Sequence, residues 1–311
     1  MSRMGTLMFR YLFEKGDEKR LSKMKQDTSD LQIQKDIAYI QDRERGHLLD
    51  IYSLKETSES APVMINIHGG GLFASYKEVN ANFNYEWARL GYRTVSISYR
   101  RIPEVTLKEQ ISDVMSAFRF LSENEQDLHL NLKDAYLTGD SAGALLSLFA
   151  LSINESDLLQ NAFQEKGVGV EFQAAGFISI CLDTQRKDLM KCISDVVLSK
   201  EEQRMPYAKY IINPISMVDV AHYPPIYLVT GDQDLIQKDT LKLEQALKKH
   251  QVKCQLKNFP KGKERVLDHV FAVKYPLWPE SREVFQRMTN YFQEGRDAPG
   301  VSKYFNEARK E

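Results

Sequence analysis

Short apolar runs and longer amphipathic segments alternate along most of this chain of 311 residues. The runs have the length of strands, and the segments between them repeat their apolar residues every three or four positions, the helical period. The predicted strands are Val63–Ile67, Thr94–Tyr99, Ala135–Thr138, Gly176–Leu182, Ile226–Thr230 and Val252–Phe259. The predicted helices are Glu78–Leu90, Leu107–Leu121, Leu235–Lys249 and Ser281–Phe292, with a further one that begins at Ala144. This alternation predicts a parallel sheet with right-handed crossovers.

Two more strand-like runs precede this pattern, at Ile33–Gln41 and His47–Leu54. The polar turn between them, Asp42–Gly46, predicts an antiparallel hairpin at one edge of the sheet. We therefore expect an α/β fold with an eight-stranded, mostly parallel sheet flanked by helices.

Two segments lie outside the alternation. Residues 1–30 space their apolar side chains as one or two amphipathic helices do, and residues 183–223 are too long for a plain crossover. The second segment contains helical patterns at Lys187–Val197 and Lys200–Tyr210. We expect N-terminal cap helices at 1–30, a main domain at 31–295 with a cap insertion at about 183–223, and a charged C-terminal tail at 296–311.

Methionines and aromatic residues gather in both cap segments, at Met4, Met8, Phe9, Tyr11 and Phe13 and at Met190, Met205, Tyr207 and Tyr210. Adaptable apolar side chains of this kind suit a lid, although they are also typical of the underside of helices that pack on a core.

The charge balance argues against polyanionic partners. Lys and Arg total 42 and Asp and Glu total 43, so the formal net charge is −1, with no long run of either sign. We therefore expect neither nucleic acid nor an anionic membrane surface as a partner, and a homodimer stays open.

The three cysteines, Cys181, Cys192 and Cys254, lack the spacings of a disulfide scaffold or of a zinc site. They predict a reducing compartment and no bound metal. Arg10 and Glu14 interrupt the apolar residues near the N-terminus too early for a secretory leader, and no apolar stretch has the length of a membrane span. We expect a cytoplasmic protein without stable membrane insertion.

The segment Thr138–Ala144 joins a predicted strand directly to a predicted helix. Its Gly139-x-Ser141-x-Gly143 spacing is the pattern of a nucleophile elbow, in which a serine occupies a strained turn that tolerates only small neighbours. Glycines beside a serine are also common in ordinary turns, so this pattern alone leaves both interpretations open.

A glycine-rich loop, His68–Gly71, closes the predicted strand Val63–Ile67. Its backbone amides, with the amide of Ala142 after the serine, can stabilise an oxyanion, each donor being worth ~3 kcal/mol of barrier. The alternative is a phosphate loop, but no Lys-Ser/Thr follows the glycines and no Gly-x-Gly-x-x-Gly is formed. We expect His68 itself to be a structural hydrogen-bonding residue.

One of the six histidines has the position that a catalytic base needs. In an open parallel sheet, ligands bind outside the carboxyl ends of the strands. His269 follows the last predicted strand on that side, whereas His47, His129, His222 and His250 each begin or precede a strand. We therefore expect His269 to be the base.

Three aspartates follow predicted strands at the same edge, namely Asp183, Asp232 and Asp234. We favour Asp234 because it lies past the first turn residues and is free to reach a histidine. Asp232, beside a glycine, is expected to bond the turn backbone. Asp183 stays open as the second candidate, since an acid on the neighbouring strand can reach the same imidazole.

Five motifs resemble those of the hormone-sensitive-lipase-like branch of the α/β-hydrolases: His68-Gly-Gly-Gly71, Ser98-Tyr-Arg-Arg-Ile-Pro-Glu104, Gly139-Asp-Ser-Ala-Gly143, Gly231-Asp-Gln-Asp234 and His269-Val-Phe271. The resemblance covers about Ile37 to Phe292. It implies an α/β-hydrolase fold, hydrolysis of carboxylic esters, a cap over the site, and oxyanion donors at Gly70, Gly71 and Ala142. Two positions depart from the family, which often has Pro-Leu after the acid and His-Gly-Phe at the base.

We therefore expect a serine carboxylesterase that hydrolyses short- to medium-chain acyl esters through an acyl-enzyme. Ser141 is the expected nucleophile, His269 the base and Asp234 the acid that orients it, and no cofactor is needed. Two alternatives remain, an amidase or formamidase with the same triad and a catalytically silent module that binds a small molecule. The intact triad argues against the second, whereas the sequence does not separate esters from amides.

Overall fold

One eight-stranded sheet forms the centre of the computed structural model, which describes residues 3–184 and 197–294. The strands are β1 (Leu31–Ala38), β2 (Leu48–Leu54), β3 (Pro62–Ile67), β4 (Arg93–Ile97), β5 (Asn131–Asp140), β6 (Phe172–Ile178), β7 (Ile226–Gly231) and β8 (Cys254–Phe259). Their spatial order is β1-β2-β4-β3-β5-β6-β7-β8. Strand β2 pairs antiparallel with both β1 and β4, and every other pairing is parallel. The predicted fold class, with its antiparallel hairpin at one edge, is confirmed.

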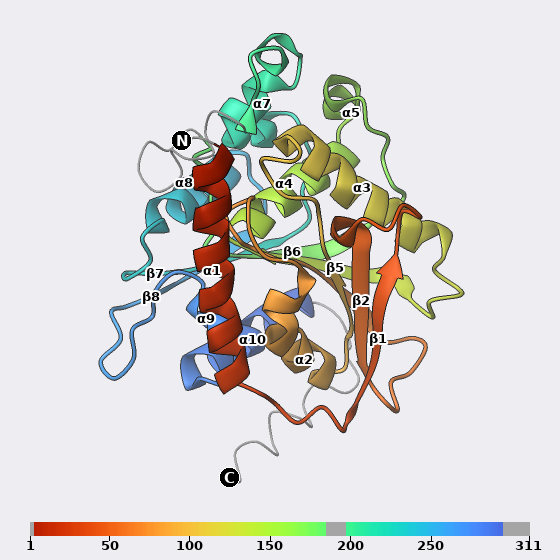
Figure 1. Cartoon of the computed structure of the whole chain (residues 1–311), viewed down its shortest axis with the longest axis vertical. Helices are drawn as coiled ribbons and strands as arrows, with labels where there is room; N and C mark the ends of the chain where they lie inside the picture. The colour runs from red at the N-terminus through yellow and green to blue at the C-terminus, as the bar shows by residue number, and fades with distance from the viewer. Residues whose placement is uncertain (1–2, 185–196, 295–311) are drawn as a thin grey trace.

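Helices cover both faces of the sheet (Figure 1). On one face lie α3 (Leu107–Glu123), α4 (Ala142–Asn154) and α8 (Gln237–Lys249), and on the other lie α2 (Ala81–Arg89), α9 (Phe271–Lys274) and α10 (Pro279–Phe292). Side chains of β3 alternate between the two cores, because successive residues of a strand point to opposite faces. Val63 and Ile65 join the core beneath α3 and α4, and Met64 joins the core beneath α2 and α10. Burial on both faces explains why the central strands read as continuous apolar runs.

Helix α1 (Arg3–Lys23) is a single helix of 21 residues that lies outside these two layers. Figure 1 shows it running from the side of α7 (Ala208–Ile212) and α8 to the side of α9 and α10. Its side chains attach it to the loops at the ends of the strands. Arg10 donates to Glu104 at 2.6 Å and to the carbonyl oxygen of Ile102 at 2.6 Å. Arg10, a charged residue, is therefore part of the contact surface of this helix.

Several elements differ from the sequence prediction. The helix expected over residues 200–210 is a short 3-10 turn at Glu202–Arg204 followed by α7, because Pro206 lacks the amide hydrogen that a continuous helix needs. Strand β6 ends at Ile178, since Ser179 adopts a positive φ of 52°. Helices α5 (Asp157–Phe163) and α9 were not predicted. Both are short, and neither reaches the length at which apolar periodicity is informative.

Some predictions fall outside the described residues. These are the helical pattern at 187–196, Met190, Cys192 and the tail at 296–311. The division into cap helices, main domain and insertion stays a prediction.

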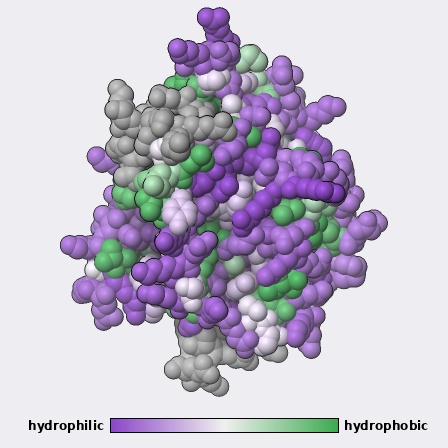
Figure 2. Space-filling view, in the orientation of Figure 1, coloured by the Kyte–Doolittle hydropathy of each residue, from purple (hydrophilic) through white to green (hydrophobic). Residues whose placement is uncertain are grey.

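On the face that Figure 2 shows, the hydrophobic residues that the structure describes form small separate groups. Across the part of the chain that the structure describes, no single helix is both long and apolar enough to span a bilayer. Helices α4 and α5, bent by 115° relative to one another, pass that test only as a pair and only by length and composition.

Candidate active site

Ser141 lies at the junction of β5 and α4 in a strained backbone conformation, with φ 52° and ψ −118°. The turn is possible because its neighbours are glycines. A Cβ atom at Gly143 would lie 2.1 Å from the carbonyl oxygen of Ile67, and one at Gly139 would lie 2.7 Å from Ser147 Oγ. The sequence therefore forms the strand, turn and helix of a nucleophile elbow, with the serine at the first turn of α4.

His269 contacts Ser141 and Asp234 at the same time. Its Nε2 atom lies 2.9 Å from Ser141 Oγ, and its Nδ1 atom lies 2.9 Å from Asp234 Oδ1. The histidine is held by its loop, in which Val270 has a positive φ of 54° and donates its amide to Ser179 Oγ. The two ring nitrogens thus connect a hydroxyl to a carboxylate in the arrangement of a Ser-His-Asp triad.

Asp234 is buried and hydrogen-bonded on both oxygens. Oδ1 also accepts the amide of Ile236, and Oδ2 accepts the hydroxyl of Thr230, each at 3.0 Å. Burial acts to raise the pKa of Asp234, but the hydrogen bond and charge of His269 outweigh it, so the pKa lies below its ordinary value. The carboxyl group is therefore ionised at neutral pH and can support an imidazolium.

The two other candidate acids have different environments. Oδ1 of Asp232 accepts hydrogen bonds from Asn258 at 2.9 Å and Gln237 at 3.1 Å on the surface. The backbone amide of Asp183 donates to Asp239. Of the three aspartates, it is Asp234 that the structure places against the imidazole.

The glycine loop after β3 curves beside the elbow. Gly70 and Gly71 have φ values of 124° and 62°, which favour glycine. A Cβ atom at Gly70 would also lie 2.2 Å from the carbonyl oxygen of Ala74. Within residues 3–184 and 197–294, the amides of Gly70, Gly71 and Ala142 donate to no other group, so all three are available to an oxyanion.

Asp140, inside the elbow, positions this loop and was not predicted from the sequence. Its Oδ1 atom accepts the amide of Gly69 at 3.0 Å and the side-chain amide of Asn80 at 2.7 Å. Burial raises the pKa of Asp140, although these two hydrogen bonds oppose the effect. Its position directly before Ser141 was the sequence signal that could have identified Asp140.

His68 is fully buried at the start of the same loop. Its ring stacks on Tyr99 with centroids 4.4 Å apart, and Nδ1 lies 2.6 Å from the carbonyl oxygen of Gly69. Burial lowers the pKa of His68 to about 4, against the opposing effect of that hydrogen bond. The ring is therefore neutral at physiological pH and holds the loop in place.

A cavity of about 310 Å³ opens above Ser141 and His269. Helix α1 contributes Phe9, Phe13, Asp17 and Arg20 to its lining, and the loop after β7 contributes Leu235 and Ile236. Other methionines and aromatic residues that the sequence favoured for a lid point elsewhere: Met8 is 63% exposed and Tyr11 is 59% exposed. The described residues contain no group of three His, Cys, Asp or Glu side chains able to hold a metal ion.

A Ser-His-Asp array at the carboxyl ends of a mostly parallel sheet, with its serine on a strand–turn–helix elbow, defines the class of α/β-hydrolases. The chain belongs to the family described as BD-FAE, whose profile matches residues 49–247.

Curated relatives of the chain are esterases. Esterase LipQ of Mycobacterium tuberculosis is 29% identical over 197 residues, which are 61% of this chain and 46% of that protein. An acetyl esterase of Salmonella typhi is 23% identical over 228 residues, which are 68% of this chain and 66% of that one. The chain thus aligns with about half of the first relative and about two thirds of the second.

Solved structures share the fold. Esterase B from Lactobacillus rhamnosis has a TM-score of 0.87 at 24% identity and covers 99% of this chain and 97% of its own. A bacterial heroin esterase has a TM-score of 0.72 at 19% identity, and the match covers 93% of this chain and 91% of that one. At these identities the likeness supports the fold.

Proposed function

We propose that this protein is a serine carboxylesterase that hydrolyses short- to medium-chain acyl esters. The single observation that carries the proposal is the position of His269, whose Nε2 atom lies 2.9 Å from Ser141 Oγ and whose Nδ1 atom lies 2.9 Å from Asp234 Oδ1. The curated relatives, which are named esterases, support the same reaction class.

In the proposed mechanism, His269 Nε2 removes the hydroxyl proton of Ser141 as Oγ attacks the ester carbonyl carbon. The amides of Gly70, Gly71 and Ala142 donate to the oxyanion of the tetrahedral intermediate. His269 then gives its proton to the leaving alcohol oxygen as the ester bond breaks and the acyl-enzyme forms. Asp234 fixes the tautomer of His269 and stabilises the imidazolium.

Water completes the cycle. His269 removes a proton from a water molecule that attacks the acyl-enzyme, and the same three amides stabilise the second intermediate. The proton returns to Ser141 Oγ as the carboxylic acid leaves. Every proton transfer in the cycle therefore passes through one imidazole.

The size of the cavity supports a preference for compact substrates. With α1 above Ser141, we propose that acyl chains of roughly two to eight carbons are cleaved best, because each methylene adds ~0.8 kcal/mol of burial until a wall is met. Measuring kcat/KM along a series of p-nitrophenyl esters tests this. Rates that still climb at palmitate, with activation at an oil–water interface, would show an open, lipase-like site.

Two experiments test the reaction and the nucleophile. A panel of p-nitrophenyl esters and matching anilides separates an esterase from an amidase, and cleavage of the anilides alone would contradict the proposal. A fluorophosphonate probe is expected to label Ser141, and an adduct located on another residue by mass spectrometry would reject the nucleophile. A small-molecule ester as the partner, no nucleic-acid partner, a cytoplasmic location and a homodimer stay predictions from the sequence.

A further inference from the structure

A charged pair lies in the wall of a cavity that is otherwise mostly apolar. Asp17 and Arg20 project from α1 into the lining, with side chains 22% and 15% exposed, and Asp17 Oδ1 lies 3.1 Å from Arg20 Nη2. Asp17 Oδ2 accepts the hydroxyl of Ser75, and Arg20 Nη1 donates to the carbonyl oxygen of Lys274. Polar side chains inside an apolar pocket commonly fix the orientation of a ligand.

Arg20 extends the pair toward the side of the cavity that His269 occupies, whereas Asp17 bonds Ser75, close to Gly70. Arg20 contacts Lys274, and the ammonium group of Lys274 lies 3.1 Å from a carboxylate oxygen of Asp268, the residue before His269. The lining of the cavity includes Arg20, Asp268, His269 and Lys274. Because His269 gives its proton to the leaving alcohol, this is the side on which the alcohol part of an ester lies.

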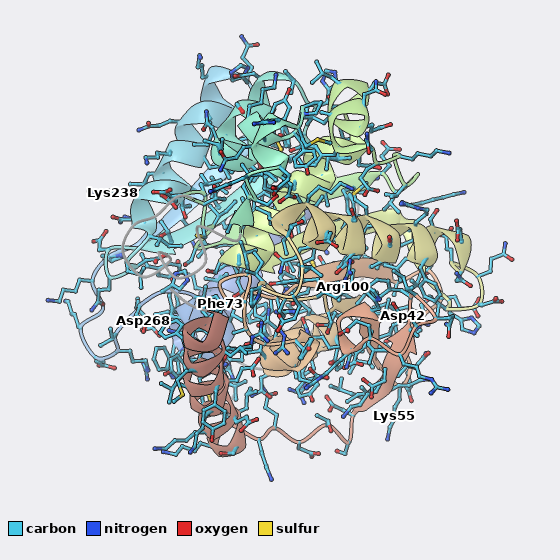
Figure 3. The ribbon with its side chains drawn as sticks, turned by 45° about the horizontal axis from the view of Figure 1, so that its top comes forward. Asp42, Lys55, Phe73, Arg100, Lys238 and Asp268 are labelled. Carbon is cyan, nitrogen blue, oxygen red and sulfur yellow. The ribbon has the colours of Figure 1, made fainter. Side chains whose placement is uncertain are left out.

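The other end of α1 supplies an apolar wall. Phe9 and Phe13 pack on Phe73, with ring centroids 5.4 and 5.9 Å apart, next to the glycine loop. Phe9 and Arg20 are separated by roughly 16 Å along the helix, given the rise of an α-helix. Figure 3 labels Phe73 next to one end of α1. One helix thus presents an apolar end and a polar end to the same cavity.

The charges at the polar end are balanced. Asp17 pairs with Arg20, and Asp268 pairs with Lys274, so neither sign is in excess for an ionic group. Hydrogen-bonding capacity remains, since a guanidinium has five N–H donors and each carboxylate oxygen accepts more than one bond. Neutral hydroxyl groups, which both donate and accept, match this end better than an alkyl chain or a charged group does.

Building on the proposed esterase function, we propose that Asp17 and Arg20 select esters whose alcohol part carries free hydroxyl groups. In this arrangement a neutral polyol donates one hydroxyl to Asp17 and accepts N–H bonds from Arg20, while its ester oxygen faces His269. The acyl chain then lies toward the phenylalanines. The pair determines specificity, and the triad performs the same reaction for every ester.

The test compares two butyrate esters whose alcohols have the same carbon chain, glycerol 1-monobutyrate and propyl butyrate. For the wild-type protein, kcat/KM is expected to be about tenfold higher for the glycerol ester, mainly through a lower KM, because bonds to charged groups stabilise the bound hydroxyls. Arg20→Leu is expected to bring this ratio close to one. Asp17→Asn is expected to lower it from about tenfold to about threefold. Lys19→Leu removes a neighbouring charge from the exposed side of α1, outside the cavity lining, and serves as the matched control that keeps the ratio.

The outcomes separate the two proposals. If the wild-type protein cleaves both esters without preferring the glycerol ester, or if the variants lower both rates equally, the pair only anchors α1 and the inference is wrong. Should Arg20→Leu not fold, Asp17→Asn decides the matter, because it keeps the size of the side chain and removes only its charge. If the wild-type protein cleaves neither butyrate nor any p-nitrophenyl ester, the proposed function fails, and this inference fails with it.

Discussion

The floor and the roof of the active-site cavity are held in place by different kinds of contact. The floor consists of Gly69–Gly71, Ser141 and His269, with Asp234 buried against His269. These residues follow the carboxyl ends of β3, β5, β7 and β8. The shape of the floor depends on backbone conformation, including positive φ at Ser141, Gly70 and Gly71. The roof is the inner side of α1, which Arg10 attaches to the loop after β4 and Arg20 attaches to the end of α9.

This difference separates reactivity from selectivity. Strained turns hold reacting atoms to within tenths of an ångström, which catalysis needs, whereas a helix attached by side chains can change its lining residues without changing the turn. Substitutions in the floor should therefore lower the rate for every ester. Substitutions in the roof should change which ester is preferred.

The largest effect is expected from Ser141→Ala, which removes the nucleophile from the floor. Turnover of p-nitrophenyl butyrate should fall by a factor on the order of 10⁶, as in serine proteases that lose this group. Alanine fits the small turn, so the thermal midpoint should stay close to that of the wild-type protein. Substantial turnover by a folded variant would show that another group attacks the ester.

Asp234→Asn should lower kcat by a factor on the order of 10⁴, because an amide favours the wrong tautomer of His269. Asp232→Asn and Asp183→Asn are matched controls, since they make the same change at neighbouring strand ends. Both should retain activity near that of the wild-type protein. An inactive Asp183→Asn variant together with an active Asp234→Asn variant would show that the catalytic acid is Asp183, on the neighbouring strand.

The pH dependence of stability tests whether the floor keeps His68 neutral. Its pKa is about 4 in the folded protein, against 6.5 for an ordinary histidine, so between these values the unfolded chain binds a proton that the folded chain does not. The free energy of unfolding should therefore fall as the pH drops through this window, by roughly 3 kcal/mol from this residue. His68→Asn should flatten the dependence, measured by urea denaturation at pH 7 and pH 4.5.

His47→Gln is the opposite control for this measurement. Burial acts to lower the pKa of His47, but hydrogen bonds and charges of Asp113 and Asp42 outweigh it and raise the pKa. A raised pKa contributes stability that is present at low pH and lost as the pH rises. The His47 variant should therefore lose more stability at pH 4.5 than at pH 7. Equal slopes for both variants would contradict these assignments.

The smallest effect is expected in the roof, from Phe9→Ala. Removing this ring enlarges the apolar end of the cavity, so octanoate should gain relative to butyrate by about fourfold for each methylene newly accommodated. Met8→Ala makes a similar truncation on the outward side of α1, where Met8 is 63% exposed. It should keep the wild-type profile along the p-nitrophenyl ester series. An unchanged profile for Phe9→Ala would show that α1 does not contact the acyl chain of the substrate.

Much of the floor could be predicted because its signals are local. Apolar periodicity located the strands, and the side of the sheet on which each loop emerges follows from parallel topology. These two signals predict Ser141, Asp234 and His269 at one edge, where the structure places His269 2.9 Å from both Ser141 Oγ and Asp234 Oδ1. Even there, the sequence missed Asp140, because its contact with Gly69 joins residues far apart in the chain.

The roof was decided by tertiary structure. Apolar residues occur around much of the circumference of α1, so periodicity did not separate Phe9 and Phe13, which line the cavity, from Met8 and Tyr11, which do not. Charge did not mark Asp17 and Arg20 as cavity residues, and they line the cavity because Ser75 and Lys274 supply hydrogen bonds there. The sequence by itself determines where the backbone forms strained turns, since such turns depend on residues that are neighbours in the chain. Which side of a helix faces a cavity depends on partners that lie far away along the chain.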